Sequence, residues 1–172
     1  MSEITAGDVS VKPGSKARGF LKVANRISGE PIGIPFFVVH GLEKGPVLCV
    51  DGGVHGDEYE GPEAVMNLGR SLEAGKLKGT MIGVPVVNVL AFESETRANP
   101  FDHERLNMNR VFPGNPNGWI TERIAHAYFT ETVRKSNYYI DLHGGGATEF
   151  LCPLVQYQRS EGFGRKDVGE RV

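Results

Sequence analysis

The chain has 172 residues, of which 40% are hydrophobic and 23% charged, and its formal net charge is −2. This length suits one domain with its own core, and the near-neutral charge argues against a nucleic-acid or anionic-membrane partner. No apolar run is long enough to span a bilayer, and we expect no signal peptide because the first residues lack a basic segment followed by an apolar one.

The first third of the chain is predicted to supply strands. Residues 1–16 are polar and are expected to form an N-terminal arm, either loose or packed. Alternation of apolar side chains predicts strands over 17–28 and 32–40, and a turn is expected at 41–46. The short apolar run 47–51 is typical of a strand that is buried on both faces.

Helices and strands alternate in the rest of the chain. The spacing of apolar residues predicts helices over 58–73 and 121–134. Buried strands are expected at 80–87 and 137–143, and the proline-bearing segment 93–117 is expected to be a long, functional loop. Alternation of strands and helices predicts an α/β protein with a layered sheet.

Cys49 and Cys152 both lie in apolar stretches, so we expect each to be a small, buried hydrophobic side chain. Two isolated cysteines do not form a disulfide framework, so we expect a reducing, cytoplasmic setting.

The segment 52–58, Gly-Gly-Val-His-Gly-Asp-Glu, follows a predicted strand and precedes a predicted helix. Ligands of open α/β sheets bind beyond the carboxyl ends of strands, and a three-residue spacing lets His55 and Glu58 aim at one point. Imidazole and carboxylate are both good zinc ligands. The alternative is a loop histidine beside a carboxylate that only stabilises the helix dipole.

A second candidate segment, Ile-Asp-Leu-His-Gly-Gly-Gly over 140–146, also stands at a predicted strand end. Asp141 and His143 share one face of that strand because side chains alternate along it. His143 would complete a His₂Glu set, the catalytic arrangement that leaves the fourth zinc position to water. Zinc lowers the pKa of that water and polarises a carbonyl group.

The long loop contributes polar candidates of a third kind. Arg110 offers a planar fork suited to a carboxylate, and the adjacent Asn109 adds a donor and an acceptor. The alternative is an arginine that caps carbonyl groups or pairs with Asp102 or Glu104. Arg97 is a further candidate cation, and its alternative is an ordinary surface charge.

Together these segments resemble the succinylglutamate desuccinylase/aspartoacylase family, a branch of the zinc carboxypeptidase-like hydrolases. The resemblance runs from about residue 36 to about residue 153, and it depends on three segments in the same order: Gly-Gly-Val-His-Gly-Asp-Glu-Tyr-Glu-Gly-Pro (52–62), Asn-Pro-Phe-Asp-His-Glu-Arg-Leu-Asn-Met-Asn-Arg-Val-Phe-Pro-Gly (99–114) and Ile-Asp-Leu-His-Gly-Gly-Gly (140–146). It implies a three-layer mixed sheet with helices on both faces.

The resemblance also implies a role for each candidate residue. His55, Glu58 and His143 match the ligands of one zinc ion. Asn109 and Arg110 match the pair that binds the free carboxylate of the substrate. Two further roles follow: Arg97 matches the arginine that stabilises the oxyanion, and Asp141 would orient a ligand histidine.

One departure from the family concerns the general base. Family members carry a catalytic glutamate well downstream of the third ligand, whereas Glu149 and Glu161 do not stand in a matching context, and Glu149 is expected to begin a strand. We therefore expect residues 17–172 to be the N-terminal portion of the catalytic domain, without the general base and the small C-terminal β domain, and to be inactive alone.

These expectations combine into a zinc-dependent hydrolase that removes the acyl group of a small N-acyl amino acid. The segment around His55 resembles most the branch that acts on substrates such as acetylated diaminobutyrate. One alternative is a metallocarboxypeptidase that trims peptides. The other is a non-catalytic module that binds zinc or carboxylates.

Overall fold

A five-stranded mixed sheet forms the centre of the computed structural model, which describes residues 2–156. The strand order is β3-β4-β6-β5-β7; β4 runs antiparallel to β3 and β6, whereas β5 runs parallel to β6 and β7. The strands are β3 (Ser15–Asn25), β4 (Pro31–His40), β5 (Glu43–Gly52), β6 (Lys78–Val84) and β7 (Tyr138–Leu142).

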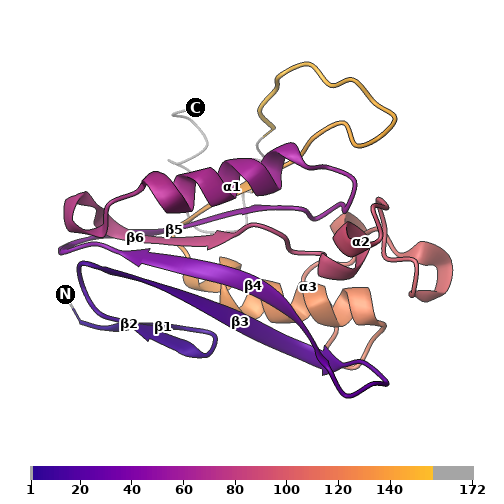
Figure 1. The fold of residues 1–172 in the computed structure, drawn as a ribbon, viewed down its shortest axis with the longest axis horizontal. Coiled ribbons are helices and arrows are strands. Elements are labelled where there is room, and N and C mark those ends of the chain that lie inside the picture. Colours follow the sequence, from indigo (N-terminus) through magenta and orange to yellow (C-terminus); the bar gives the residue numbers. More distant parts are fainter. Residues whose placement is uncertain (1, 157–172) are drawn as a thin grey trace, which may run out of the picture.

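Helices cover both faces of this sheet (Figure 1). Helix α1 (Glu60–Ser71) lies over β5 and β6, and helix α3 (Ile120–Glu131) packs on the opposite face against β3 and β4. The short helix α2 (Val89–Glu93) follows β6. The predicted three-layer α/β architecture is therefore confirmed.

Each face of the sheet has its own hydrophobic core. On the α1 side, Val65 of the helix packs with Val39, Val50 and Met81 of the strands. On the α3 side the core is larger and extends to α2 and to the N-terminal residues. Its fully buried large side chains include Ile34, Val38, Ile82, Val84, Met108, Ile124 and Tyr128. Two cores on opposite faces fix the sheet as a rigid support for the loops at its edge.

The N-terminal residues form a small hairpin. Strands β1 (Ile4–Ala6) and β2 (Val9–Val11) pair with each other, and β2 packs beside β3. Ala6 and Val11 are buried in the core, and Ile4 and Val9 pack against it partly buried, so this hairpin is packed rather than loose.

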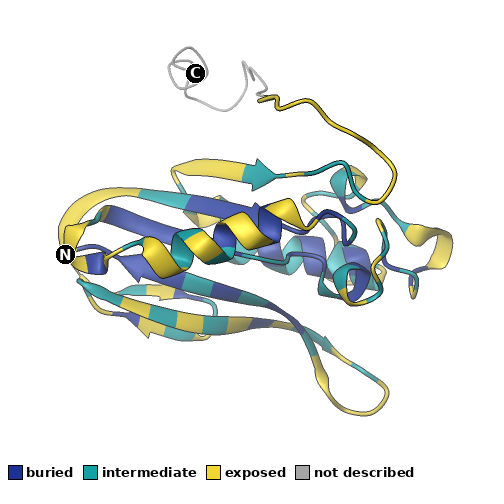
Figure 2. Cartoon of the chain, turned by 45° about the horizontal axis from the view of Figure 1, so that its top comes forward, coloured by how far each residue is buried: buried dark blue, intermediate teal, exposed yellow. Residues whose placement is uncertain are grey.

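Strand β7 differs from its prediction. It was expected to be buried, but Tyr138, Tyr139 and Ile140 are exposed, as the outer strand in Figure 2 shows. The reason is that β7 is the last strand of the described sheet and pairs with β5 alone. An edge strand has a neighbour along only one of its two edges, so the apolar sequence of β7 did not imply full burial.

The segment 93–117 is largely loop, as predicted, with short 3-10 turns at His103–Arg105 and Met108–Arg110. Two smaller expectations were wrong. Glu149 begins no strand, since residues 143–156 are irregular, and Cys152 is exposed there. Cys49 is buried as expected.

Glu161 and the segment 159–172 lie outside the described residues. Within residues 2–156, no helix has the length and apolar character needed to cross a membrane.

Candidate metal centre

The candidate metal ligands stand where two parallel strands end. Gly52 at the end of β5 is the register partner of Leu142 at the end of β7, so the loops that follow leave the sheet at the same edge. The first loop carries His55 and Glu58, and His143 follows β7 directly. The topology therefore brings together ligands that are 85 residues apart in sequence.

The first loop is locked by close backbone contacts. A Cβ atom on Gly56 would lie 2.1 Å from the carbonyl carbon of Ala91 in α2, and one on Gly61 would lie 2.6 Å from the carbonyl oxygen of Leu142. Neither neighbour is a flexible side chain, so only glycine fits at these positions. The glycine spacing of the segment is thus explained by packing of the loop between α2 and β7.

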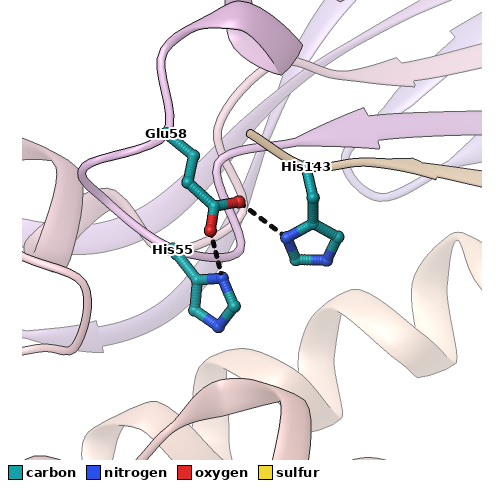
Figure 3. A group of neighbouring side chains, drawn as sticks. All are labelled: His55, Glu58 and His143. Carbon is teal, nitrogen blue, oxygen red and sulfur yellow. Dashed lines mark hydrogen bonds and ion pairs between the residues drawn. The ribbon is translucent and has the colours of Figure 1, made fainter. Parts of the chain in front are cut away.

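The three predicted ligands converge on one point (Figure 3). Nδ1 of His55 lies 2.9 Å from Oε1 of Glu58, and Nδ1 of His143 lies 2.7 Å from Oε2 of the same carboxylate. One ligand atom from each residue falls within 4.8 Å of the other two. His55 and Glu58 are each 2% exposed, whereas the side chain of His143 is 31% exposed.

Glu58 is ionised in this setting. Burial alone would raise the pKa of its carboxyl group, but the backbone N–H of Gly144, 3.1 Å away, and the two histidines reverse that effect and lower the pKa. A carboxylate must be ionised to bind a cation, so this environment prepares Glu58 as a ligand.

The far nitrogens of both imidazoles are held by oxygen atoms. Nε2 of His55 lies 3.1 Å from Oδ1 of Asn107, and Nε2 of His143 lies 2.9 Å from Oδ2 of Asp141. Ligand histidines usually donate their second N–H to such acceptors, which fixes the ring and leaves the other nitrogen for the metal. The donor set therefore fits a zinc ion bound by two Nδ1 atoms and one carboxylate.

The imidazole of His143 lies between the carboxylates of Asp141 and Glu58. The hydrogen bond to Asp141 is the main cause that raises the pKa of His143 to about 9, and Glu58 adds to it. A ring between two carboxylates donates one N–H to each of them, which requires both nitrogens to be protonated. A metal ion must displace one of these protons.

Two other predicted residues contact the ligand set. Nη1 of Arg97 donates to Oε1 of Glu58 at 2.8 Å, and Nδ2 of Asn109 lies 3.2 Å from Nε2 of His143. Arg110 is different: it is exposed, and its guanidinium donates to the carbonyl oxygen of Asn109 at 3.2 Å. Arg110 therefore caps a carbonyl group, which was one of the alternatives to substrate binding. The other alternative, an ion pair with Asp102 or Glu104, is not found among the described residues.

Asn107 is a site residue that the sequence analysis missed. Its side-chain oxygen accepts from the backbone N–H of Asn109 at 2.9 Å as well as facing His55. The available signal was its place two residues before Asn109, where an asparagine commonly closes a turn. Because one side chain fixes both the 3-10 turn Met108–Arg110 and a ligand ring, the long loop and the metal centre form one unit.

The family model described as the succinylglutamate desuccinylase/aspartoacylase catalytic domain matches residues 44–165. The N-alpha-acetyl-L-2,4-diaminobutyric acid deacetylase of Halomonas elongata is 41% identical over 140 residues, which is 80% of this chain and 40% of that protein. The family-model match spans all three candidate ligands, His55, Glu58 and His143.

Solved structures agree with this match. A succinylglutamate desuccinylase/aspartoacylase from Rhodobacter sphaeroides is 32% identical with a TM-score of 0.73, covering 82% of this chain and 43% of that one. The product-bound ectoine utilization protein EutE (DoeB) from Ruegeria pomeroyi is 34% identical with a TM-score of 0.70, covering 84% and 43%. The chain thus spans about two fifths of the length of these relatives.

A more distant neighbour identifies the wider fold class. Bovine thrombin-activatable fibrinolysis inhibitor, a carboxypeptidase-like protein, is 15% identical, has a TM-score of 0.55, and is similar over 74% of this chain and 53% of its own. At this identity the similarity shows the fold alone. The family match and the identity to longer relatives show more: the chain belongs to the succinylglutamate desuccinylase/aspartoacylase family.

Proposed function

We propose that this protein is the ligand-bearing part of a zinc-dependent hydrolase that cleaves the amide bond of an N-acyl amino acid. The observation that supports this most is the convergence of two imidazole nitrogens on one ionised carboxylate at the edge of the sheet. Few other functions need two histidines whose Nδ1 atoms face the same carboxylate while their Nε2 atoms are anchored.

His55, Glu58 and His143 would hold one zinc ion. When bound, that ion supplies Lewis acidity, which lowers the pKa of a water molecule and polarises the acyl carbonyl group. The protein keeps the ligand atoms in place through Asn107 and Asp141, which hold the far nitrogens of the two rings.

Arg97 would stabilise the negative charge that develops on the acyl oxygen. Its guanidinium lies one hydrogen bond from Glu58, so it is already at the ligand set, and its side chain is 50% exposed toward the solvent from which a substrate enters. A positioned cation of this kind lowers the energy of a tetrahedral oxyanion more than that of the neutral substrate.

Asn109 and Arg110 would bind the free carboxylate of the substrate. Asn109 is beside His143, and Arg110 follows it in the same 3-10 turn, so a carboxylate bound there would place its amide near the ligands. Among residues 2–156, Arg110 engages one backbone carbonyl, which leaves other guanidinium donors for a planar, bidentate contact.

The relatives suggest the substrate class. One deacetylates an N-acetylated diaminobutyric acid, and another is an ectoine utilization protein solved with its product. We therefore propose a small N-acetyl amino acid as substrate. The glutamate that the family uses as general base remains a prediction for a position downstream of His143.

The test is a hydrolysis panel that compares N-acetyl amino acids, including N-acetyl-diaminobutyrate, with dipeptides, using the uninterrupted gene product loaded with zinc. We expect release of acetate, loss of that activity in His55→Ala, and an increased KM in Arg110→Ala with an unchanged zinc content. Preference for dipeptides would favour the carboxypeptidase alternative. Zinc binding without hydrolysis of either class would favour the non-catalytic one.

A further inference from the structure

A second carboxyl group lies directly beside Asp141. Asp51 on β5 and Asp141 on β7 are register partners in a parallel pair of strands, so their side chains leave the sheet on the same face, and the two carboxyl groups interact directly. Asp51 is completely buried, and no described cation pairs with it. The family motifs and the mechanism proposed above give it no role.

Two tyrosine hydroxyl groups anchor Asp51. Tyr128 of α3 donates to Oδ2 of Asp51 at 2.5 Å, and Tyr139 of β7 donates to the same oxygen at 3.3 Å. Burial raises the pKa of Tyr128 well above its ordinary value, so its hydroxyl stays a donor throughout the physiological range. One oxygen of Asp51 therefore accepts two hydrogen bonds and is fixed in position.

The remaining oxygens of the two carboxyl groups are unpaired as they stand. Oδ1 of Asp51 and Oδ1 of Asp141 are both buried without a hydrogen-bond partner among the described residues. Burial first, and then the adjacent charge of Asp141, raises the pKa of Asp51 well above its usual range. A proton on Asp51 that is shared with Asp141 would give both oxygens a partner and would remove the repulsion of two adjacent carboxylates.

We propose that Asp51 is a positioning residue of the metal centre: its neutral carboxyl group, anchored by Tyr128 and Tyr139, donates a hydrogen bond to Asp141. Asp141 is thereby held against Nε2 of His143, which points Nδ1 toward Glu58. The inference rests on the zinc site proposed above. It assigns a chain of contacts from helix α3 through β5 and β7 to the most exposed of the three ligands.

The first test measures zinc affinity by competition with a chromophoric chelator. We expect Asp51→Ala to weaken zinc binding by about tenfold, the lower end of the range seen when direct partners of metal ligands are removed, because Asp51 acts through Asp141. Asp51→Asn should stay within about threefold of wild type, because its amide N–H can still donate to Asp141 while its oxygen accepts from the tyrosines. Tyr128→Phe, which keeps the shape of the core, should show a smaller loss than Asp51→Ala.

Cys49→Ala is the matched control. Cys49 is buried two residues from Asp51 on the same face of β5, and its Sγ lies 3.8 Å from the Tyr128 hydroxyl, but no described hydrogen bond joins it to Asp141. This variant removes core volume of a similar kind, so it should lose stability without losing zinc affinity. Affinity that falls equally in Cys49→Ala and Asp51→Ala would show a general packing effect and overturn the proposal.

The second test needs no metal and follows thermal unfolding of wild type and Asp51→Asn between pH 5 and pH 8 with chelator present. The folded state holds the proton on Asp51, whereas the unfolded chain releases it above about pH 4. Wild type should therefore lose stability relative to Asp51→Asn as the pH rises. Among the other groups that face Asp51, the Cys49 thiol, whose pKa burial raises to about 12, and the two tyrosines stay neutral over this range. Asp141 is the partner whose interaction with Asp51 the substitution tests.

The outcomes separate this inference from the proposed function. A wild-type protein that binds no zinc would contradict the proposed function. Wild-type zinc affinity in Asp51→Ala would contradict only the positioning role. A loss in Asp51→Asn as large as in Asp51→Ala, or a stability difference that does not change with pH, would show that Asp51 carries no shared proton and would overturn the proposal in this form.

Discussion

The two loops that carry the proposed metal ligands are built differently. The loop after β5 holds His55 and Glu58 almost completely buried and is pressed against the backbone of α2 and β7. The segment after β7 holds His143 at the end of an exposed edge strand, where it is positioned by side-chain hydrogen bonds to Asp141 and Glu58. Two ligands are thus preformed by backbone packing, and the third depends on its polar neighbours.

The largest effect should come from a pair of glycine substitutions that compares the two loops. In Gly56→Ala the new Cβ would lie 2.1 Å from the carbonyl carbon of Ala91, whereas in Gly144→Ala it would meet the flexible end of Glu60. We expect the first change to lower the free energy of unfolding by about 3 kcal/mol or more, and the second by less than about 1 kcal/mol. Urea denaturation measures both.

Equal losses in these two variants would contradict the comparison. Such a result would mean that the segment after β7 is packed as rigidly as the loop after β5.

The next effect concerns pH and should be confined to the segment after β7. The pKa of His143 in the folded, metal-free protein is raised to about 9 from an ordinary 6.5, mainly by Asp141. Its contribution to stability is fully present below about pH 6.5 and is lost as the pH rises through about 9. With chelator present, wild type should exceed His143→Gln in melting temperature at pH 6, and this difference should shrink by pH 9.

Taking the difference between the two proteins cancels the pH dependence of the groups that do not interact with His143. A difference that stays constant from pH 6 to pH 9 would mean that His143 gains nothing from Asp141 and Glu58.

The smallest predicted effect extends the comparison to the long loop. Asp102 is buried, and its Oδ2 accepts from the backbone N–H of Thr121 at 3.1 Å, in the first turn of α3. Asp102→Ala removes this cap and should cost about 1 kcal/mol of stability, with Asp102→Asn retaining part of it. Zinc affinity should change less than stability in both variants, because no described hydrogen bond joins Asp102 to His55, Glu58 or His143.

The fold could be predicted wherever local pattern and tertiary environment agree. The apolar run 47–51 and the helix pattern 121–134 correspond to β5 and α3 because both are buried as their sequences suggest. The pattern failed where tertiary context decides. Strand β7 has an apolar sequence but stands at the edge of the described sheet, and residues 4–11, expected only as part of an arm, pair as a hairpin whose apolar side chains pack on the core.

The candidate site shows the same division. His55, Glu58 and His143 could be proposed from sequence because their types and their places at strand ends imply a metal. Asn107 and Asp51 could not, because an asparagine in a loop and an aspartate at a strand end have many roles. Their function depends on the contact of Asn107 with a ring from another loop and on the register that sets Asp51 beside Asp141.

The most direct test of this account is X-ray absorption spectroscopy of the zinc-loaded protein, with metal content measured on the same sample. We expect one zinc ion per chain, only nitrogen and oxygen neighbours, and the multiple-scattering signal of two imidazoles, one of which disappears in His143→Gln. Absence of stoichiometric zinc, or a sulfur neighbour from Cys49 or Cys152, would contradict a centre formed by His55, Glu58 and His143.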